Sequence, residues 1–323
     1  MESWTARPYA LSDVDRILGL INQIQPHAPF TRARWDWAYR DGPGGPGQAW
    51  ITDFGGVIAS LTGALPFDWF IEGEVRKAVL WVDTMTHPDF RKQGLHALLT
   101  GMALEDFRGS GLPLAYVFPN DNSVHHIQKT GWLRVMEVPL FARAVPTLDT
   151  NRRPSVSIKP AARFGTEVDW VSQNMRESVP FVLARTSKYL NWRYFAKPGE
   201  AYRCWVAVAG GRPSGFLVCK LFNTLAGERR FHMIDFWARP SDGDTWSALI
   251  RHALREAAES QATEISCWMP VAAPGRPVLI EHGFEPRQTN RYLFAQAPES
   301  EGVCKRISDP ANWYLTMGDS DVY

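Results

Sequence analysis

The sequence contains few cysteines, and none of them is spaced as a metal site requires. Four occur in 323 residues, all in the second half, without Cys-x-x-Cys spacing or companion histidines. This pattern argues against a zinc site and against a disulfide scaffold. We therefore expect reduced and mostly buried thiols. The four residues are Cys204, Cys219, Cys267 and Cys304.

The sequence also has almost no net charge and no long apolar run. Lysine and arginine number 35 against 34 aspartates and glutamates, a net charge of +1, so no overall field draws the protein to nucleic acid or to an anionic membrane. No apolar run approaches the roughly 18 residues that span a bilayer, and the first residues lack the features of a signal peptide. We expect a cytoplasmic protein with a small-molecule partner; the sequence does not indicate its oligomeric state.

The chain is long, and many of its residues recur in order. Hydrophobic residues make up 45% of the 323 residues, so the chain is too long for one ordinary domain and can bury two cores. One set of residues recurs after 155 positions, as from Trp37 to Trp192, and another after 152, as from Asp83 to Asp235. The matches are Trp37-Ala38-Tyr39 with Trp192-Arg193-Tyr194, Pro43 with Pro198, Trp50 with Trp205, Gly55-Gly56 with Gly210-Gly211, Asp83 with Asp235, Pro88 with Pro240, and Gly131-Trp132 with Gly283-Phe284.

We interpret these matches as a duplicated module. The segment 144–159 supplies prolines and polar residues without an apolar period, which is typical of a linker. The sequence therefore predicts one domain over residues 1–146 and a second over residues 156–323.

The apolar pattern of the first half predicts a mixed α/β module. Helical spacing over residues 14–24 ends at Pro26, and a glycine turn at 55–56 separates two short strands. The predicted elements are helix 14–24, strands 50–52, 57–64 and 79–86, helix 95–107, strand 114–118 and helix 123–130. The second half repeats this order, with strands near Cys204, Phe216, His232 and Ile265 and a helix over 245–259.

The loop after Pro88 joins a strand to a helix and carries both basic residues and a glycine. It reads Asp89-Phe90-Arg91-Lys92-Gln93-Gly94-Leu95-His96. Such a turn presents free backbone N–H groups and the positive end of the helix dipole, which suit a pyrophosphate.

This loop resembles the acyl-CoA signature of the GNAT (GCN5-related N-acetyltransferase) family, Arg/Gln-x-x-Gly-x-Gly/Ala after the strand that pairs with pantetheine. Arg91 and Gly94 fall on signature positions, whereas His96 replaces the last glycine. Further along, Phe118-Pro119-Asn120-x-x-Ser123 and Lys129-x-Gly131-Trp132 resemble the second signature of the family, in which Asn lies where the thioester sulfur emerges.

The resemblance implies two tandem GNAT-like domains, each a mixed, mostly antiparallel sheet flanked by helices. It also implies an N-acyltransferase with acetyl-CoA or another acyl-CoA as co-substrate. The implied CoA-binding residues are Met85, Thr86, Arg91, Lys92, Gln93, Gly94, Leu95, His96, Asn120 and Ser123. The second half has Gly243 and Trp246 at the positions of Arg91 and Gly94, beside the acidic Asp242 and Asp244, so we expect no CoA there.

Two residues are candidates for proton transfer. Many GNAT enzymes have a tyrosine acid where this chain has Ile127, so we consider His125 and His126 as replacements and favour the adjacent His126; the alternative is a solvated histidine pair on a helix surface. Asp83 could take a proton from the amine through a water. Strand alternation places the Asp83 side chain on the face of the strand opposite to the face that carries Val82 and Thr84. Its recurrence as Asp235 favours a structural hydrogen bond as much as catalysis.

Aromatic residues leave two further alternatives. The segment 313–323 is acidic and aromatic. We consider two alternatives for it: it packs as a last strand of the second domain, or Asp319 and Asp321 reach the cleft as ligands of a cation or an amine. The 14 tryptophans could stack on sugars, but recurrence of Trp37 and Trp50 in both halves suits packing better. The tryptophans of the first half considered for stacking are Trp35, Trp37, Trp69, Trp81 and Trp132.

The first functional hypothesis is an N-acyltransferase that acts on a small amine by direct attack on the thioester. The chain resembles sugar N-acyltransferases of surface polysaccharide or antibiotic pathways, which suggests an amino sugar or sugar nucleotide. The alternative is an inactive acyl-CoA-binding sensor or partner protein, supported by the missing tyrosine and by His96. A transferase using aminoacyl-tRNA is less well supported, because no basic surface is evident.

Overall fold

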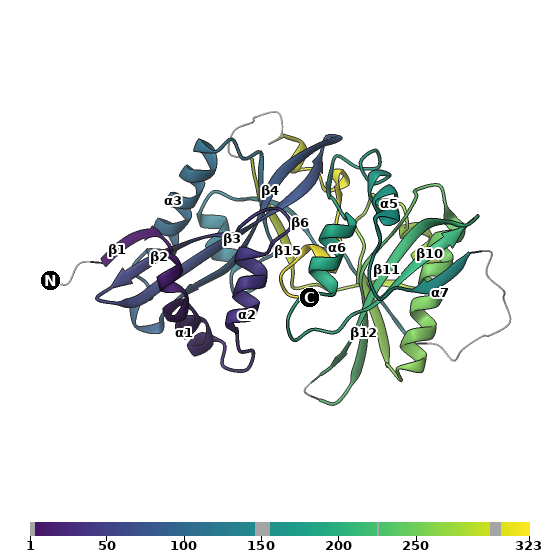
Figure 1. The fold of residues 1–323 in the computed structure, drawn as a ribbon, viewed down its shortest axis with the longest axis horizontal. Helices are drawn as coiled ribbons and strands as arrows, with labels where there is room; N and C mark the ends of the chain where they lie inside the picture. Colours follow the sequence, from purple (N-terminus) through teal and green to yellow (C-terminus); the bar gives the residue numbers. More distant parts are fainter. Residues whose placement is uncertain (1–3, 146–155, 225, 298–304) are drawn as a thin grey trace. The chain divides into compact units, whose positions relative to one another are not determined.

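The computed structural model describes residues 4–145, 156–224, 226–297 and 305–323 (Figure 1). The chain forms two compact units, each assembled from separate stretches of sequence. The first contains residues 1–68, 76–135 and 292–308, and the second contains 69–75, 136–291 and 309–323. Residues 146–155, which form most of the predicted linker at 144–159, and Cys304 lie outside the described residues. The boundaries 1–146 and 156–323 therefore stay a prediction.

The first unit is built on a mixed and mostly antiparallel sheet, as expected. Its strand order is β1-β2-β3-β4-β5-β15-β6. Along this order β4 and β5 pair in parallel, with Ala78 opposite Leu114. The strands are β1 (Trp4–Pro8), β2 (Gln48–Phe54), β3 (Val57–Ile71), β4 (Glu74–Thr86), β5 (Leu114–Val117), β6 (Leu133–Glu137) and β15 (Tyr292–Gln296).

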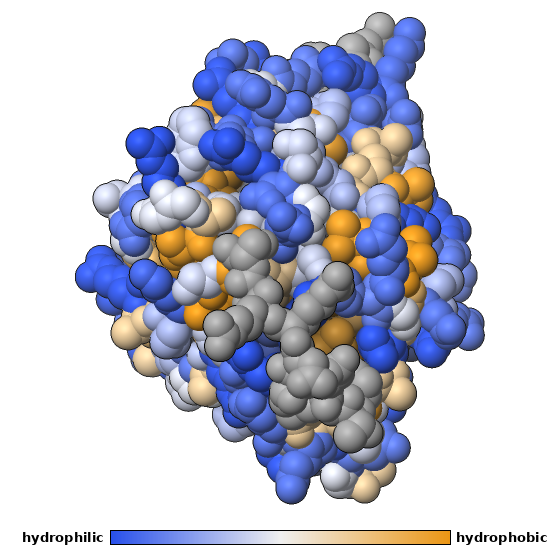
Figure 2. Space-filling view, turned by 90° about the vertical axis from the view of Figure 1, so that its right-hand side faces the viewer, coloured by the Kyte–Doolittle hydropathy of each residue, from blue (hydrophilic) through white to orange (hydrophobic). Residues whose placement is uncertain are grey.

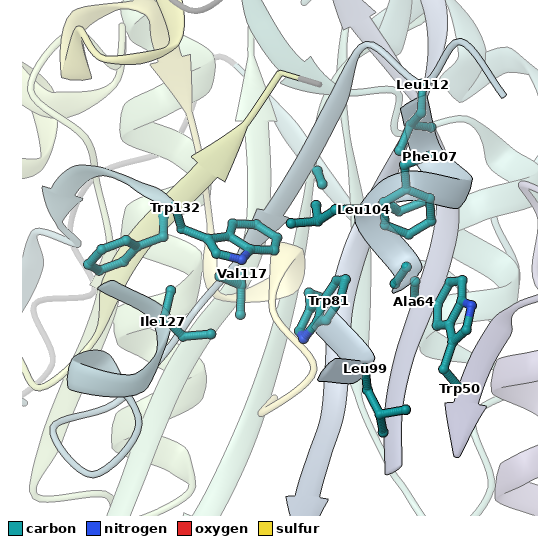
Figure 3. Packing of buried hydrophobic residues seen from close by; sticks show 14 of the residues in the cluster. Trp50, Ala64, Trp81, Leu99, Leu104, Phe107, Leu112, Val117, Ile127 and Trp132 are labelled. Atoms are coloured by element: carbon teal, nitrogen blue, oxygen red, sulfur yellow. The ribbon is translucent and has the colours of Figure 1, made fainter. Parts of the chain in front are cut away.

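Helices flank this sheet, and tryptophans fill the space between them. The helices are α1 (Val14–Ile24), α2 (Arg32–Trp35), which continues into a π-helical turn (Asp36–Arg40), α3 (Leu95–Gly109) and α4 (Val124–Lys129). Trp81 lies against Trp132 and Trp50, with ring centroids 5.4 and 6.4 Å apart, and Leu99 and Phe107 of α3 belong to the same buried cluster (Figure 3). These indoles are core residues, as the repeat indicated.

The second unit repeats the sheet strand for strand, in the order β8-β10-β11-β12-β13-β7-β14. Its strands are β7 (Leu140–Ala144), β8 (Ser157–Pro160), β10 (Arg203–Ala209), β11 (Arg212–Asn223), β12 (Arg229–Ala238), β13 (Glu264–Trp268) and β14 (Glu285–Arg287). Its helices are α5 (Asp169–Gln173), α6 (Ser187–Tyr194), α7 (Gly243–Glu259) and α8 (Arg276–Glu281). The short strands β9 (Phe181–Leu183) and β16 (Trp313–Tyr314) pair in parallel, and β9 also pairs with the end of β3.

The register of the two sheets preserves the repeat. Trp50 faces Thr62 in the first unit, and Trp205 faces Leu217 in the second, each 155 positions further along. Both hairpins have an irregularity at equivalent positions, after Thr52 and after Ala207. Strands β7 and β15 each pair in the sheet of the other half of the sequence. Strand β7 precedes the predicted linker yet pairs with β13 in the second sheet, while β15, near the end of the chain, pairs with β5 in the first (Figure 1).

The described thiols are buried, as the sequence predicts, and one face of the molecule is mostly hydrophilic. The face in Figure 2 is mostly hydrophilic, with hydrophobic residues in small separate groups. Among the described residues, no helix is long and apolar enough to cross a membrane, and no three side chains gather as metal ligands. Cys204, Cys219 and Cys267 are free and buried. Burial raises the pKa of Cys204 to about 12, so this thiol stays protonated at neutral pH.

Candidate active site

The turn between β4 and α3 leaves a helix N-terminus open. Arg91, Lys92, Gln93 and Gly94 are exposed. Lys92 and Gly94 adopt positive φ values of 65° and 77°, which curve the backbone into a concave turn of the kind that binds anions. No side chain caps α3, and a Cβ added at Gly94 would meet no atom within 4 Å. The first N–H groups of α3 are therefore left for an incoming anion.

The side chains of Leu95 and His96 are turned into the protein and do not contribute to the open turn. Leu95 is 4% exposed and belongs to the core, so only its backbone N–H serves the turn. The His96 ring lies beside His126 of α4, with centroids 6.3 Å apart, and both of its ring nitrogens are buried without a hydrogen-bond partner. Burial and the nearby His126 lower the pKa of His96, which favours a neutral ring. The structure thus brings two candidate residues together.

The end of β4 is tied to β3 and to the basic turn. The Ser60 hydroxyl donates to the Met85 carbonyl at 2.9 Å and shares a hydrogen bond of 3.1 Å with the Thr86 hydroxyl. Arg91 Nε donates to the Thr86 carbonyl at 3.4 Å. These bonds fix the strand end from which the turn departs. Ser60 was not among the predicted site residues.

Asn120 and Ser123 build the turn that leads into α4. Asn120 Oδ1 accepts from the backbone N–H groups of Asn122 and Ser123, at 3.0 and 3.2 Å. Ser123 Oγ in turn accepts from the Asn120 N–H at 3.1 Å. This reciprocal pattern is an Asx turn, which positions the end of β5. A contact of either residue with CoA stays a prediction.

The short helix α4 carries the candidate acid. His125 and His126 are exposed on its surface. Ile127, which stands where many GNAT enzymes have tyrosine, is 4% exposed and packs in the core of Figure 3. The isoleucine therefore contributes to stability, and the titratable side chains of this helix are His125, His126 and Lys129.

Asp83 interrupts β4 and is held by a tyrosine. Its φ of 51° is unusual for a non-glycine residue, so the simple alternation assumed from the sequence does not apply at this point of the strand. The Tyr39 hydroxyl donates to Asp83 Oδ2 at 2.6 Å. The Tyr39 ring stacks on Trp35 with centroids 3.9 Å apart and crosses Gly63, where a Cβ would lie 2.0 Å from the hydroxyl oxygen. Asp83 itself is half-buried.

The second unit contains the same pair in a closed setting. Tyr194 donates to Asp235 Oδ2 at 2.8 Å, and Arg185 Nε donates to Asp235 Oδ1 at 2.7 Å. Arg185 also pairs with Asp319 at 2.5 Å, and the side chains of these three charged residues are fully buried. The final segment therefore packs, with β16 as its strand, and Asp319 serves a structural ion pair.

The helix that corresponds to α3 is closed as well. Asp242 caps α7 by accepting from the Thr245 N–H at 2.9 Å and from its hydroxyl at 2.6 Å. Trp246 is fully buried, and its indole N–H donates to the Arg239 carbonyl at 3.0 Å. A carboxylate thus occupies the place that an anionic ligand would need. The expected lack of CoA in this half stays a prediction, which this geometry favours.

The sequence pointed to Asp83 but not to its partner. Tyr39 and Tyr194 recur at a shift of 155, and Asp83 and Asp235 at a shift of 152. Because both members of the pair recur together, their joint recurrence was the signal that could have identified a contact. Periodicity within one element carries no such information.

Comparison with known proteins gives a family match for the first part of the chain and a shared fold over most of its length. Residues 5–135 match a family described as acetyltransferase (GNAT) domain. No curated protein matches the sequence.

Three solved structures share the fold across most of the chain. A GCN5-related N-acetyltransferase from Anabaena variabilis is 12% identical, with a TM-score of 0.73, over 94% of this chain and 74% of that one. N-myristoyltransferase from Saccharomyces cerevisiae with bound myristoyl-CoA is 9% identical, with a TM-score of 0.60, over 91% and 83%. A fungal glucosamine N-acetyltransferase region is 13% identical, with a TM-score of 0.61, over 91% of this chain and 38% of that one.

Proposed function

We propose that this protein is an acyl-CoA-dependent N-acyltransferase and that it transfers the acyl group to a small primary amine. Residues 5–135 match the acetyltransferase (GNAT) domain family. The observation that carries the proposal is the open N-terminus of α3, where the exposed turn 91–94 precedes a helix without a side-chain cap. An anionic co-substrate can reach the backbone there, and the reacting end of that co-substrate would extend along β4 toward Asp83.

The CoA diphosphate would bind the backbone N–H groups that begin α3, around Gly94, Leu95 and His96. The helix dipole and the side chains of Arg91 and Lys92 favour the negative charge. Pantetheine would follow the end of β4 at Met85 and Thr86. Gln93 lies at the rim of the turn, and the Asn120–Ser123 turn would border the thioester.

Direct attack requires a neutral amine and a protonated leaving group. Asp83 would accept a proton from the bound ammonium, directly or through a water. The amine nitrogen then forms a bond to the acyl carbon and gives up its second proton to solvent, and the carbon–sulfur bond breaks as CoA leaves. His126 would supply the proton to the thiolate sulfur. Alignment of the two substrates supplies much of the remaining rate enhancement.

An amino sugar or sugar nucleotide is our candidate acceptor. Support comes from the resemblance of the sequence to sugar N-acyltransferases, and the glucosamine N-acetyltransferase region shares the fold. Tryptophan stacking is not part of this proposal, because Trp35, Trp37, Trp69, Trp81 and Trp132 are all buried. A sugar would be recognised by hydrogen bonds and by its amine.

Thiol release from acetyl-CoA with a panel of amines, including glucosamine, tests the proposal. We expect release that depends on one class of amine. Thermal stabilisation by CoA without turnover on any amine would instead indicate the sensor, which the buried Ile127 at the position of the family tyrosine favours. Absence of both CoA binding and turnover would refute the proposal.

The CoA position has its own test. In Gly94→Ala a methyl group would project into the open space over the turn at a strained φ of 77°, and we expect CoA affinity, measured by calorimetry, to fall by about tenfold or more. The matched control is Gly243→Ala in the first turn of α7, where a Cβ also meets no atom within 4 Å. Equal losses in the two variants would contradict the assignment.

A further inference from the structure

Two departures from the GNAT signatures meet in the first unit. His96 stands where the first signature ends in glycine or alanine, and Ile127 stands where many GNAT enzymes have a tyrosine acid. The His96 ring, on α3, makes an edge-to-face contact with the ring of His126, the residue before Ile127 on α4, with centroids 6.3 Å apart. The two histidines lie on different helices, so only the fold brings these departures together.

The core fixes the backbone on both sides of this contact. Leu95 precedes His96 and is 4% exposed, and Ile127 follows His126 and is also 4% exposed. Leu99, one turn further along α3, belongs with Ile127 to the buried cluster of Figure 3. Helices α3 and α4 are therefore held to one core, and packing sets the distance between the two rings.

The two rings differ in their surroundings. Both ring nitrogens of His96 are buried without a hydrogen-bond partner among the described residues, whereas His126 is exposed. Burial, and after it the charge of His126, lowers the pKa of His96. Two close imidazoles resist a second positive charge, so a proton taken up by the pair resides on His126. His96 then presents a neutral ring, in which one nitrogen can accept a hydrogen bond.

The second half lacks both histidines. At the shift of 152 positions, alanine (Ala248) and valine (Val278) take the places of the two histidines. The core position of Ile127 is kept, as the fully buried Leu279. The histidine pair is therefore not a requirement for packing of the module, and it occurs in the half whose helix N-terminus is open.

We propose that His96 is a positioning residue for His126: its ring accepts a hydrogen bond from one N–H of His126, directly or through a water, and so orients the other N–H for donation to the thioester sulfur. This inference rests on the proposed function, in which His126 supplies the proton to the thiolate. The donated proton moves from His126 to the sulfur as the carbon–sulfur bond breaks, and the ring takes a proton back from solvent after CoA leaves. The histidine in place of the signature glycine thus supports the acid that replaces the tyrosine.

The substitution His96→Ala tests the inference, because alanine is itself a residue of the family signature at this position. We expect kcat to fall by about tenfold, while KM for acetyl-CoA changes by less than about twofold. His96→Gln keeps a donor and an acceptor on the side chain and should retain kcat within about threefold of the wild type. Urea unfolding of both variants reports whether the fold is retained.

A double-mutant cycle separates positioning from a general structural effect. His126→Ala should lower kcat by about 100-fold, as expected for loss of a general acid. Adding His96→Ala should lower kcat by less than about twofold more, because no ring is left to position. The neighbouring His125, which is also exposed on α4, provides the matched comparison, and His125→Ala should change kcat by less than about twofold.

The outcomes distinguish the inference from the function on which it rests. A folded His96→Ala enzyme with full kcat, a change confined to KM for acetyl-CoA, or losses that multiply in the double variant overturns the inference and leaves the acyltransferase intact. A kcat that falls with His125→Ala instead of His126→Ala overturns it as well. Absence of turnover with every amine overturns the proposed function itself.

Discussion

The two halves hold the same tyrosine–aspartate contact in opposite surroundings. In the second half, Arg185 and Asp319 enclose Asp235 in a buried charge network. In the first half, Asp83 is half-buried, and Phe30 stands 155 positions before Arg185, at the shift that relates Tyr39 to Tyr194. The contact itself is thus a property of the module, and the residues around it decide what the carboxylate can bind.

The two long helices show a parallel difference. The turn before α3 has Gly94 at φ 77° and leaves the helix uncapped, whereas Asp242 caps α7 with its own carboxylate. An N-terminal turn satisfied by an internal anion has no need of an external one. The cap from Asp242 and the buried Trp246 together distinguish the structural helix end of the second half from the candidate phosphate site of the first.

The largest expected effect comes from breaking the buried network. Arg185→Met leaves Asp235 and Asp319 buried without their cation, so we expect the free energy of unfolding of the protein to fall by about 3 to 5 kcal/mol. Urea unfolding at pH 7 measures the change. As a control, Arg230→Met removes a surface cation whose side chain is 47% exposed, and it should cost less than about 0.5 kcal/mol.

The carboxylates supply the second arm of that experiment. Adding Asp235→Asn and Asp319→Asn to Arg185→Met removes the uncompensated charges and should recover much of the lost stability. If Arg185→Met alone costs under about 1 kcal/mol, the network does not stabilise the second half in the way we describe.

A smaller effect is expected from pH. Burial, followed by the charges of Arg230 and Lys220, lowers the pKa of His232 to about 4. In the unfolded chain this histidine binds a proton near pH 6.5, so the folded state loses stability as pH falls from about 6.5 to 4, by about 2 kcal/mol at pH 5. The first half has Leu80 at the equivalent position, 152 residues earlier, and therefore lacks this contribution to the pH dependence of stability.

The measurement compares urea unfolding of the wild type and His232→Gln at pH 7.5 and 5. We expect the loss of stability on acidification to be smaller in the variant. His232 also shares a hydrogen bond of 2.7 Å with the Ser266 hydroxyl. Loss of this bond lowers the stability of the variant at both pH values. An identical pH dependence in the two proteins would show that His232 does not titrate as we propose.

The smallest effect tests the alignment of the halves. Thr31 caps α2 by accepting from the Arg34 N–H at 3.2 Å, and Thr186, 155 positions later, caps α6 by accepting from the Tyr189 N–H at 3.3 Å. Thr31→Ala and Thr186→Ala each remove one of these hydrogen bonds and should each lower the free energy of unfolding by about 1 kcal/mol. Thr→Ser at the same positions keeps the oxygen and should cost much less. Thermal unfolding of the four variants gives the comparison. A cap whose removal has no effect would weaken the equivalence of Phe30 and Arg185.

Local patterns were sufficient for much of the fold. Apolar spacing over 14–24 predicted α1, which has these bounds, and the run at 79–86 identified the part of β4 that leads to the turn. The glycine pair at 55–56 predicted the β2–β3 hairpin. These features depend on neighbours within a few residues, and the sequence displays such neighbours directly.

Long-range contacts were not evident in the same way. The Asp83 side chain was assigned to a face by alternation, but its positive φ breaks the alternation. Arg185 and Asp319 are 134 residues apart, and Tyr39 and Asp83 are 44 apart. The exchange of β7 and β15 between the sheets was not indicated by the hydrophobic pattern, because both are short strands of mostly apolar residues whose composition does not specify a sheet.

The sequence by itself determined that a module is repeated, that its first copy carries a basic glycine turn at a helix entrance, and that the second copy lacks it. The tertiary structure alone decided which side chains surround each repeated aspartate. Turn and helix signals are set by the conformational preferences of adjacent residues, whereas the partners of a carboxylate are set by the packing of segments that are distant in sequence. That packing makes Asp235 part of a core and leaves Asp83 accessible.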